Sequence, residues 1–317
     1  MKKRTILLLI RKFHLLAPKH QLKFDMMQAL EAEANVLYWH EDGSILDILA
    51  SLEQKPDFIL HYDIAWGYYF APRITDLEKV DIPKGCYVMD IHWEKAKRLH
   101  YFLQSKVDLV FSVTKTAFLA NFPMMKQKFR WLPFSINDKV IKDWAMPKDI
   151  TYLLMGLVYL EGEHHPPKGR YPFREEVVNQ MRDVEGFTLR KHPGHFTKNA
   201  TFINEMYSKE LNRSSIFFTC GGAFKYPVMK YFEALGSRTL LIAESNEDII
   251  ELGFKDGEHY VACECSEIYE KALFYYHNEQ ERMRITNNGF RWIHTHHTNE
   301  IRAKQCMEMI EKCIHDK

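Results

Sequence analysis

Short runs of apolar residues alternate along the chain with amphipathic stretches that carry apolar residues at every third or fourth position. The apolar runs are continuous, which is typical of parallel strands that are buried on both faces. We expect strands at residues 5–10, 35–39, 57–61, 86–90, 109–113, 130–133, 150–155, 187–190, 215–219, 239–243 and 260–262. The repetition of strand, helix and strand predicts an α/β protein with open, doubly wound sheets and right-handed crossovers.

This rhythm is interrupted at the polar residues 135–149, and a length of 317 residues also favours two domains. We predict a Rossmann-like domain at 1–140, a second one at 150–297, and a helix at 298–317 that packs back on the first domain. The helix should bury an apolar stripe made of Ile301, Met309, Ile310, Cys313 and Ile314. The two domains are expected to face each other across a cleft at the carboxyl ends of their strands, where open α/β folds bind ligands.

Composition excludes several classes of protein. The 43 basic and 42 acidic residues leave a formal net charge of +1, so we expect no nucleic-acid partner. The six cysteines form no regular framework, which favours free thiols in the cytoplasm. The first apolar run ends at Arg11 and is too short for an export signal or a membrane span. A peripheral contact with a membrane and the oligomeric state are left open.

The clearest candidate site lies around the helix predicted at 227–235. Gly221 and Gly222, in the loop before it, let the backbone approach a ligand, and free N–H groups at such a turn attract phosphate oxygens. On the helix itself, the carboxylate of Glu233 is suited to accept hydrogen bonds from two ribose hydroxyls. The alternative is a surface helix on which Glu233 pairs with Lys230, and the residues alone do not decide between the two interpretations.

Two other loops of the second domain bring polar side chains to strand ends. Tyr171 opens a helix on which Arg174 can bind a diphosphate with two parallel hydrogen bonds, although a solvated basic loop has the same composition. Arg190 and His192 follow the strand predicted at 187–190, which places them at the expected cleft. His192 has the alternative role of capping its loop.

In the first domain, Asp90 and His92 lie at the end of a predicted strand and two positions apart, so both side chains should point to one side. A carboxylate and an imidazole there are suited to bind an acceptor hydroxyl and to take its proton. The alternative is that Asp90 caps the next helix. His61 and Asp63, after the preceding strand, are weaker candidates.

Histidines and cysteines follow no common zinc spacing, so we expect neither a metal site nor another cofactor.

The segment from Lys230 to Ala243, with Gly253 to Glu258 after it, resembles glycosyltransferases of the GT-B fold, above all the group 1 class and its spore-maturation CgeB-like branch. In that class a Phe-Glu-Ala segment precedes a small-residue turn and an apolar strand, and its glutamate binds the ribose of the donor. Glu233 matches that glutamate. A second glutamate, which contacts the donor sugar in the class, is replaced here by Lys225.

Similar proteins also carry a Tyr-Pro-Leu-Arg-like segment where Tyr171 to Arg174 stand, a His-Pro-Gly segment at His192, and an Asp-x-His segment at Asp90. The resemblance implies a glycosyltransferase that moves a sugar from a nucleotide-sugar donor to a glycan or another hydroxyl acceptor. We expect it to need no metal, because no Asp-x-Asp pair stands at a strand end and the basic groups near Arg174 can take the diphosphate. Together with the local patterns described above, it leads us to expect donor binding by Glu233, Lys230, Gly221, Gly222, Lys225, Arg174, Tyr171, Arg190 and His192. The alternatives are a nucleotide-sugar epimerase, another group transferase of this fold, or an inactive protein that binds a nucleotide sugar or glycan. The loss of the acid at Lys225 is the feature that leaves the last alternative open.

Overall fold

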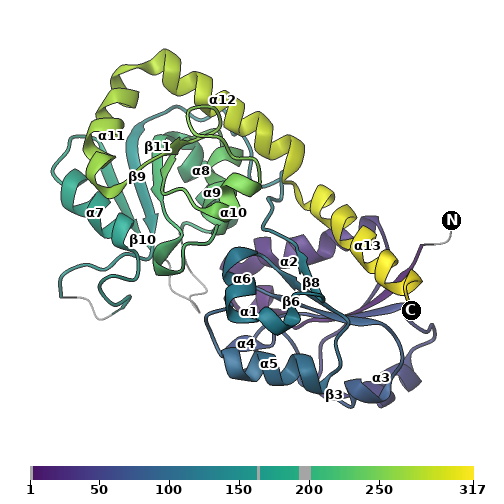
Figure 1. The fold of residues 1–317 in the computed structure, drawn as a ribbon. Coiled ribbons are helices and arrows are strands. Elements are labelled where there is room, and N and C mark those ends of the chain that lie inside the picture. The colour runs from purple at the N-terminus through teal and green to yellow at the C-terminus, as the bar shows by residue number, and fades with distance from the viewer. Residues whose placement is uncertain (1–2, 163–164, 193–200) are drawn as a thin grey trace. The chain divides into compact units, whose positions relative to one another are not determined.

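A computed structural model describes residues 3–162, 165–192 and 201–317. The chain divides into two compact units. Unit 1 comprises residues 1–16, 23–133 and 300–317, and unit 2 comprises residues 17–22 and 134–299. The predicted fold class, an α/β protein with parallel sheets and helices at the C-terminal end of the sequence, is confirmed (Figure 1).

Unit 1 contains a six-stranded parallel sheet in the order β2-β1-β4-β6-β7-β8. Its strands are β1 (Thr5–Leu9), β2 (Asn35–Trp39), β4 (Phe58–His61), β6 (Lys84–Val88), β7 (Leu109–Ser112) and β8 (Phe129–Trp131). Two short strands that the sequence did not predict, β3 (Gly43–Ser44) and β5 (Ile74–Thr75), pair separately. The strand order reverses between β1 and β4, and ligands of such sheets bind at the carboxyl ends of strands beside a reversal of this kind.

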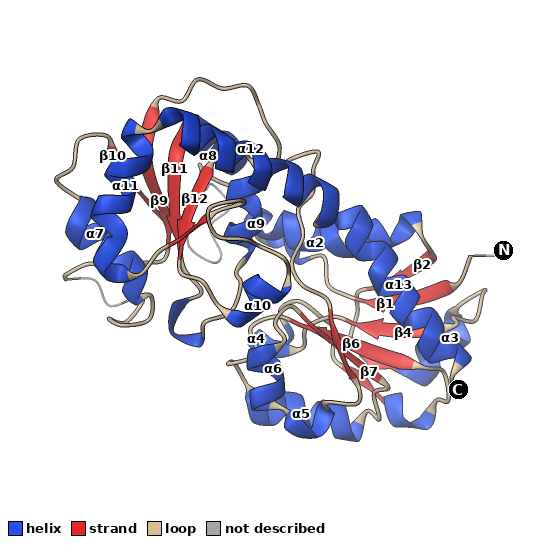
Figure 2. Ribbon diagram, turned by 45° about the horizontal axis from the view of Figure 1, so that its top comes forward, coloured by secondary structure: helices blue, strands red, loops and turns tan. Residues whose placement is uncertain are grey.

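Helices cover both faces of this sheet (Figures 1 and 2). They are α1 (Phe13–Leu16), α2 (Gln21–Gln28), α3 (Ile45–Ser51), α4 (Ala65–Tyr68), α5 (Lys95–Gln104), α6 (Thr116–Asn121) and α13 (Asn299–His315). Short 3-10 helices occur at Pro18–His20, Ala29–Ala32, Leu77–Lys79 and Pro123–Met125. Helices α3, α5 and α6 share one hydrophobic core with the alternate strand residues Leu7, Ile59, Cys86 and Val110, as expected when successive side chains point to opposite faces.

The apolar stripe predicted on α13 is wrong in phase. The buried residues of α13 are Asn299, Arg302, Ala303, Cys306, Met307 and Ile310, so Ile310 is the one member of the predicted stripe that is fully buried. Arg302 is charged and lies outside the predicted apolar stripe, yet its side chain is enclosed beside Tyr87. Burial lowers the pKa of Arg302 to about 10, and the nearby Tyr87 opposes that shift.

Unit 2 contains a five-stranded parallel sheet in the order β10-β9-β11-β12-β13. The strands are β9 (Ile150–Gly156), β10 (Phe187–Lys191), β11 (Ser214–Thr219), β12 (Leu240–Ala243) and β13 (Val261–Ala262). The helices are α7 (Pro172–Met181), α8 (Asn204–Arg213), α9 (Met229–Gly236), α10 (Glu247–Glu251), α11 (Ile268–His277) and α12 (Glu279–His296), with 3-10 helices at Gly222–Phe224 and Cys265–Glu267. Here the strand order reverses between β9 and β11.

Residues 135–149, which the sequence presented as a polar interruption, pack on unit 2. The amide oxygen of Asn212 in α8 accepts hydrogen bonds from the backbone N–H groups of Trp144 and Met146, each at 3.1 Å. The indole of Trp144 also donates to Ser208 at 3.0 Å. This segment therefore has a fixed place against α8, although the chain forms no long helix or strand there.

No helix in the part of the chain that the structure describes has both the length and the apolar character needed to cross a membrane. All six cysteines are unpaired.

Candidate functional site

Arg174 lies at the point where the strand order of unit 2 reverses. Its side chain extends from the first turn of α7 to the loops that follow β9 and β11, and it is only 3% exposed. Nη1 donates to the carbonyl of Leu157 at 3.0 Å, and Nη2 donates to the Thr219 hydroxyl at 3.1 Å and to the Cys220 carbonyl at 3.3 Å. One guanidinium therefore connects the carboxyl ends of two neighbouring strands.

These bonds correct the expectation that Arg174 is free to bind a diphosphate with two parallel hydrogen bonds. Both terminal nitrogens are occupied by the protein, and the buried Nε is the one nitrogen without a partner among the described residues. The acceptors of Arg174 are uncharged, and it forms no ion pair within the described residues. The side chain thus contributes positive charge to this edge of the sheet. The ring of Tyr171, 4.4 Å from the guanidinium carbon, lies against it.

Lys230 and Glu233 from α9 meet through a residue that the sequence did not indicate, Tyr207 of α8. The Lys230 ammonium donates to the Tyr207 hydroxyl at 3.1 Å, and that hydroxyl donates to a Glu233 oxygen at 2.8 Å. Burial lowers the pKa of Lys230 to about 8; Glu233 raises this pKa and Arg174 lowers it further. Burial and the neighbouring Glu233 carboxylate raise the pKa of Tyr207 well above its usual value. Lys230 is half-buried, whereas Glu233 is 6% exposed.

Gly156, the last residue of β9, brings these groups together and was missed in the sequence. A Cβ there would lie 3.1 Å from Cε of Lys230 and 3.2 Å from Nη1 of Arg174. Its φ of 151° also falls in the region that glycine adopts most easily. A glycine at the end of an apolar run, as in Met155–Leu157, is the sequence signal that could have identified this position.

The glycine loop before α9 is compact because neighbouring parts of the protein pack closely against Gly221 and Gly222. A Cβ at Gly221 would lie 2.8 Å from the backbone of Tyr226, and one at Gly222, whose φ is 65°, would lie 2.9 Å from the ring of Tyr171. The loop thus needs both glycines to close on itself. Lys225 ends the loop in a left-handed conformation and is exposed.

Arg190 has a partner inside the protein. Its Nε donates to Glu210 at 2.7 Å, and Glu210 is buried. His192 follows β10 directly, whereas Pro193, Gly194 and His195 lie outside the described residues. Arg190 is therefore held toward α8 by this ion pair, which is separate from the hydrogen bonds that Arg174 and Lys230 make.

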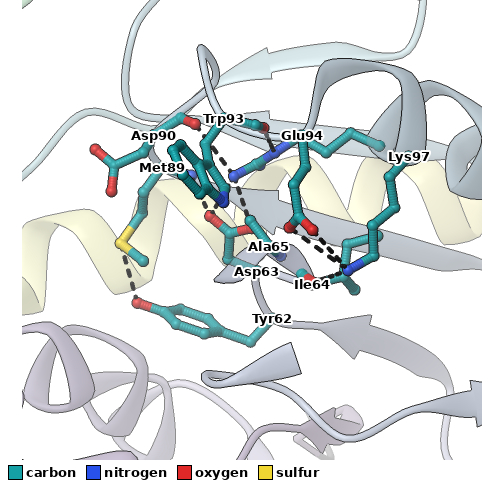
Figure 3. Close-up of polar contacts among 10 residues, drawn as sticks. Tyr62, Asp63, Ile64, Ala65, Met89, Asp90, Trp93, Glu94 and Lys97 are labelled. Carbon is teal, nitrogen blue, oxygen red and sulfur yellow. Dashed lines mark hydrogen bonds and ion pairs between the residues drawn. The ribbon is translucent and has the colours of Figure 1, made fainter. Parts of the chain in front are cut away.

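In unit 1 the strand that precedes Asp90 and His92 is shorter than expected. β6 ends at Val88, so both residues lie in the loop that follows it, and strand periodicity does not set their directions. The loop turns tightly because the Trp93 N–H donates to the Asp90 carbonyl at 2.9 Å. The Asp90 carboxylate is half-buried and points away from Asp63 (Figure 3), and it forms no hydrogen bond or ion pair within the described residues.

A buried ion pair holds the loops that follow β4 and β6. The carboxylate of Asp63 accepts hydrogen bonds from the N–H groups of Ala65 at 3.0 Å and Met89 at 2.9 Å, and Nη2 of Arg98 lies 3.0 Å away (Figure 3). Nε of Arg98 donates to the Trp93 carbonyl at 3.0 Å. Both side chains of the pair are completely buried.

His61, one of the weaker candidates, is part of the core. Its ring nitrogens lie 2.7 Å from the Tyr101 hydroxyl and 2.9 Å from the Pro72 carbonyl. Burial lowers the pKa of His61 to about 4, and the hydrogen bond to Pro72 opposes this shift. A neutral imidazole with both nitrogens occupied stabilises the fold and takes no part in proton transfer.

The described residues contain no group of three or more His, Cys, Asp or Glu side chains arranged to hold a metal ion. In the histidine-rich end of α12, His294 bonds to the Gly236 carbonyl at 3.0 Å and His296 to the Trp292 carbonyl at 3.1 Å. His164 lies outside the described residues.

Each unit thus contains a parallel sheet with helices packed on it, and the carboxyl edge of the second sheet carries the basic pair Arg174 and Lys230. Residues 174–308 match a family model described as "Glycosyl transferase-like", and this range begins at Arg174 and includes Lys230 and Glu233. Membership of the CgeB-like branch stays a prediction, whereas the predicted GT-B-like fold is confirmed by solved structures.

Three solved structures resemble the chain over nearly its whole length. Sucrose-phosphate synthase from Thermosynechococcus elongatus has a TM-score of 0.67 at 11% identity, over 99% of this chain and 100% of that one. A glycosyltransferase from Rickettsia africae gives 0.59 at 11%, over 100% of both chains. Anabaena HepE in complex with UDP and glucose gives 0.57 at 12%, over 98% of this chain and 100% of that one. Curated protein sequences give no significant match. At these identities the likeness concerns the fold.

The buried ion pair gives a prediction about stability. Asp63→Ala leaves the Arg98 charge buried without a counter-charge, so the free energy of unfolding of unit 1 should fall by about 3–5 kcal/mol. Urea unfolding followed by circular dichroism measures this change. Glu94→Ala is the matched control, because it removes a carboxylate from a solvent-accessible pair with Lys97, which should cost at most about 1 kcal/mol. Equal losses in the two variants would contradict the prediction.

Proposed function

We propose that the protein is a glycosyltransferase that uses a nucleotide-sugar donor, and that unit 2 binds the donor. The observation that carries this proposal is the basic cluster at the strand reversal of unit 2. There the Arg174 charge has only uncharged acceptors and Lys230 lies next to it, within the segment that matches the glycosyl transferase-like family. A nucleoside diphosphate supplies a counter-charge to Arg174, whose hydrogen-bond acceptors among the described residues are all uncharged.

We assign Lys230 to the diphosphate and Glu233 to the ribose. Burial removes water from the ammonium group of Lys230 and lowers its pKa, which means that its charged form is destabilised. An anionic ligand stabilises that charged form in place of the lost water. The carboxylate of Glu233 is fixed by its bond from Tyr207, so a hydrogen bond to a ribose hydroxyl would need little further ordering. UDP is the probe we choose because the similar HepE structure contains it.

Transfer also requires an acceptor with a hydroxyl group, which we place in unit 1. The bond between the anomeric carbon and the diphosphate oxygen breaks, a bond to the acceptor oxygen forms, and the hydroxyl proton passes to a base. We assign that base to Asp90, whose carboxylate has no partner among the described residues, with His92 on the same loop. The leaving diphosphate takes the bonding electrons and is stabilised by Arg174 and Lys230.

We also propose that the reaction needs no divalent metal, because basic side chains stand where the diphosphate would bind. The cytoplasm remains our proposed location, on the basis of six unpaired cysteines.

The first prediction concerns the ribose contact. Glu233→Ala should weaken UDP binding by roughly 1.5–3 kcal/mol, the range for hydrogen bonds to a charged group. Isothermal titration calorimetry of the folded variant measures it, and Glu270→Ala, which removes an exposed carboxylate from α11, is the matched control. Unchanged affinity in Glu233→Ala would exclude the assigned contact.

The second prediction concerns pH. The charged form of Lys230 binds the diphosphate, and its pKa lies near 8. The affinity for UDP should therefore fall as pH rises from about 7 to about 9 and the ammonium loses its proton. In Lys230→Met the affinity should be lower at neutral pH and nearly constant across this range. Parallel pH profiles for the two proteins would show that Lys230 does not bind the diphosphate.

The third prediction concerns the acceptor proton. Asp90→Asn and His92→Ala should each lower kcat for transfer of glucose from UDP-glucose at least about tenfold, at the lower limit of general acid–base effects. The Kd for UDP should not change, because neither residue is assigned to the donor. Wild-type turnover in both variants would mean that the pair has a structural role.

The fourth prediction concerns metal ions. Turnover of UDP-glucose should continue in excess EDTA and should not rise when manganese is added. Loss of turnover in EDTA and its recovery with manganese would refute metal independence. Absence of turnover in both conditions, with UDP still bound, would favour the inactive binding protein over the enzyme.

A further inference from the structure

Two tryptophans at the carboxyl edge of the first sheet form an exposed stacked pair. Trp66 belongs to the loop after β4 and Trp93 to the loop after β6, and these strands are neighbours in the sheet. Their ring centroids are 4.4 Å apart, and the ring planes differ by only 9°. Even so, Trp66 is 38% exposed and Trp93 is 44% exposed. Two stacked indoles that remain accessible offer a flat apolar surface against which a ligand ring can pack.

The backbone that carries the pair is held in conformations that non-glycine residues avoid. Trp66 has a φ of 57°, Tyr68 of 64° and Glu94 of 49°. A left-handed residue other than glycine is strained by its Cβ, and such conformations persist where the surroundings impose them. Their concentration in the two loops around the indoles indicates that the position of these rings is maintained at a cost in stability.

Hydrogen bonds made by the buried residues Asp63 and Arg98 hold the two loops, and therefore the two indoles, in place. Asp63 accepts from Ala65 in one loop and from Met89 in the other, and Arg98 donates to the carbonyl of Trp93 itself. Lys97 adds a second connection, because its ammonium lies 3.3 Å from the Ile64 carbonyl and 4.3 Å from the ring centroid of Tyr68. Both indoles are thus fixed before any ligand arrives, which lowers the entropy cost of binding.

The charge beside the pair limits what it can bind. Asp90 lies on the same turn as Trp93, and its carboxylate has no hydrogen-bond or ion-pair partner among the described residues (Figure 3). A free carboxylate accepts hydrogen bonds from hydroxyl groups and repels phosphate. The face of an indole carries negative charge density and attracts C–H groups that are slightly positive. A neutral ring with C–H groups on one face and hydroxyls around its edge satisfies both requirements.

We infer that Trp66 and Trp93 form a saccharide platform, so that the acceptor of the reaction is a pyranose sugar whose C–H face lies on an indole and whose hydroxyls reach Asp90. The role of this sugar as the acceptor rests on the proposed function, whereas the binding of a sugar ring by Trp66 and Trp93 does not depend on it. It names the substrate class: a glycan, in place of a lipid alcohol or a protein side chain.

The test uses the full chain and a panel of methyl glucopyranoside, methyl galactopyranoside and methyl mannopyranoside, with sorbitol as an open-chain control. Saturation-transfer NMR should show saturable binding of at least one glycoside through its ring C–H protons and none of sorbitol. Trp66→Ala and Trp93→Ala should each weaken binding about tenfold or more, which corresponds to about 1.4 kcal/mol. Trp93→Phe, which keeps an aromatic face, should retain most of it.

Leu103→Ala is the matched control, since it removes an exposed apolar side chain from α5 and should leave binding unchanged.

Calorimetry with UDP on the same samples separates the two proposals. Glycoside binding that depends on the tryptophans without any binding of UDP would keep the platform and overturn the donor site. UDP binding with no saturable glycoside binding, or with equal glycoside binding in Trp93→Ala, would overturn the platform. Binding to phosphatidylglycerol vesicles that Trp93→Ala abolishes, in the absence of glycoside binding, would assign the pair to a lipid surface and overturn it as well.

Discussion

A guanidinium group that is removed from water is stabilised by hydrogen bonds to the protein, and two such groups organise the carboxyl edges of the two sheets. In unit 1 Arg98 donates to Asp63 and two backbone carbonyls, and thereby connects the loops after β4 and β6. In unit 2 Arg174 donates to Thr219 and backbone carbonyls, and connects the loops after β9 and β11. One nitrogen of each group, Nη1 of Arg98 and Nε of Arg174, has no partner among the described residues. The electrostatic result differs, since Asp63 neutralises Arg98 whereas Arg174 keeps its charge. One edge is left with the carboxylate of Asp90 and the other with a cationic cluster.

The sheets were predictable from the sequence because their strands are buried on both faces. Each predicted strand exists, and the strand Asn35–Trp39 has the predicted bounds, since a continuous apolar run between polar residues allows little else. Strand ends were less certain. Met89 continues the apolar run beyond β6, but its N–H bonds to the Asp63 side chain and not to a neighbouring strand. The short strands β3 and β5 carry no apolar run and were missed for that reason.

The candidate sites were only partly predictable. Residue types with obvious chemistry, such as Glu233, Lys230 and Arg174, were selected from local pattern, and the structure brings Lys230 and Glu233 together. Tyr207 could not be selected, because it lies on a helix distant in the sequence and becomes a partner of Lys230 only through the packing of α8 on α9. The stacking of Trp66 on Trp93 was equally hidden, since it depends on left-handed backbone that no sequence pattern announces. The burial of Arg302 was not predicted either, because charged residues are normally expected at the surface and this one is enclosed.

The division of the chain has a consequence for the order in which the protein folds on the ribosome. Unit 1 requires residues 300–317, and these are synthesised after the whole of unit 2. Helix α13 covers Tyr87 and its neighbours with Arg302 and Cys306, so this face of the first sheet stays incompletely covered while residues 134–299 emerge. The nascent first sheet is therefore the part that most needs protection from aggregation, and shortening the chain from its C-terminal end would damage the unit that is made first.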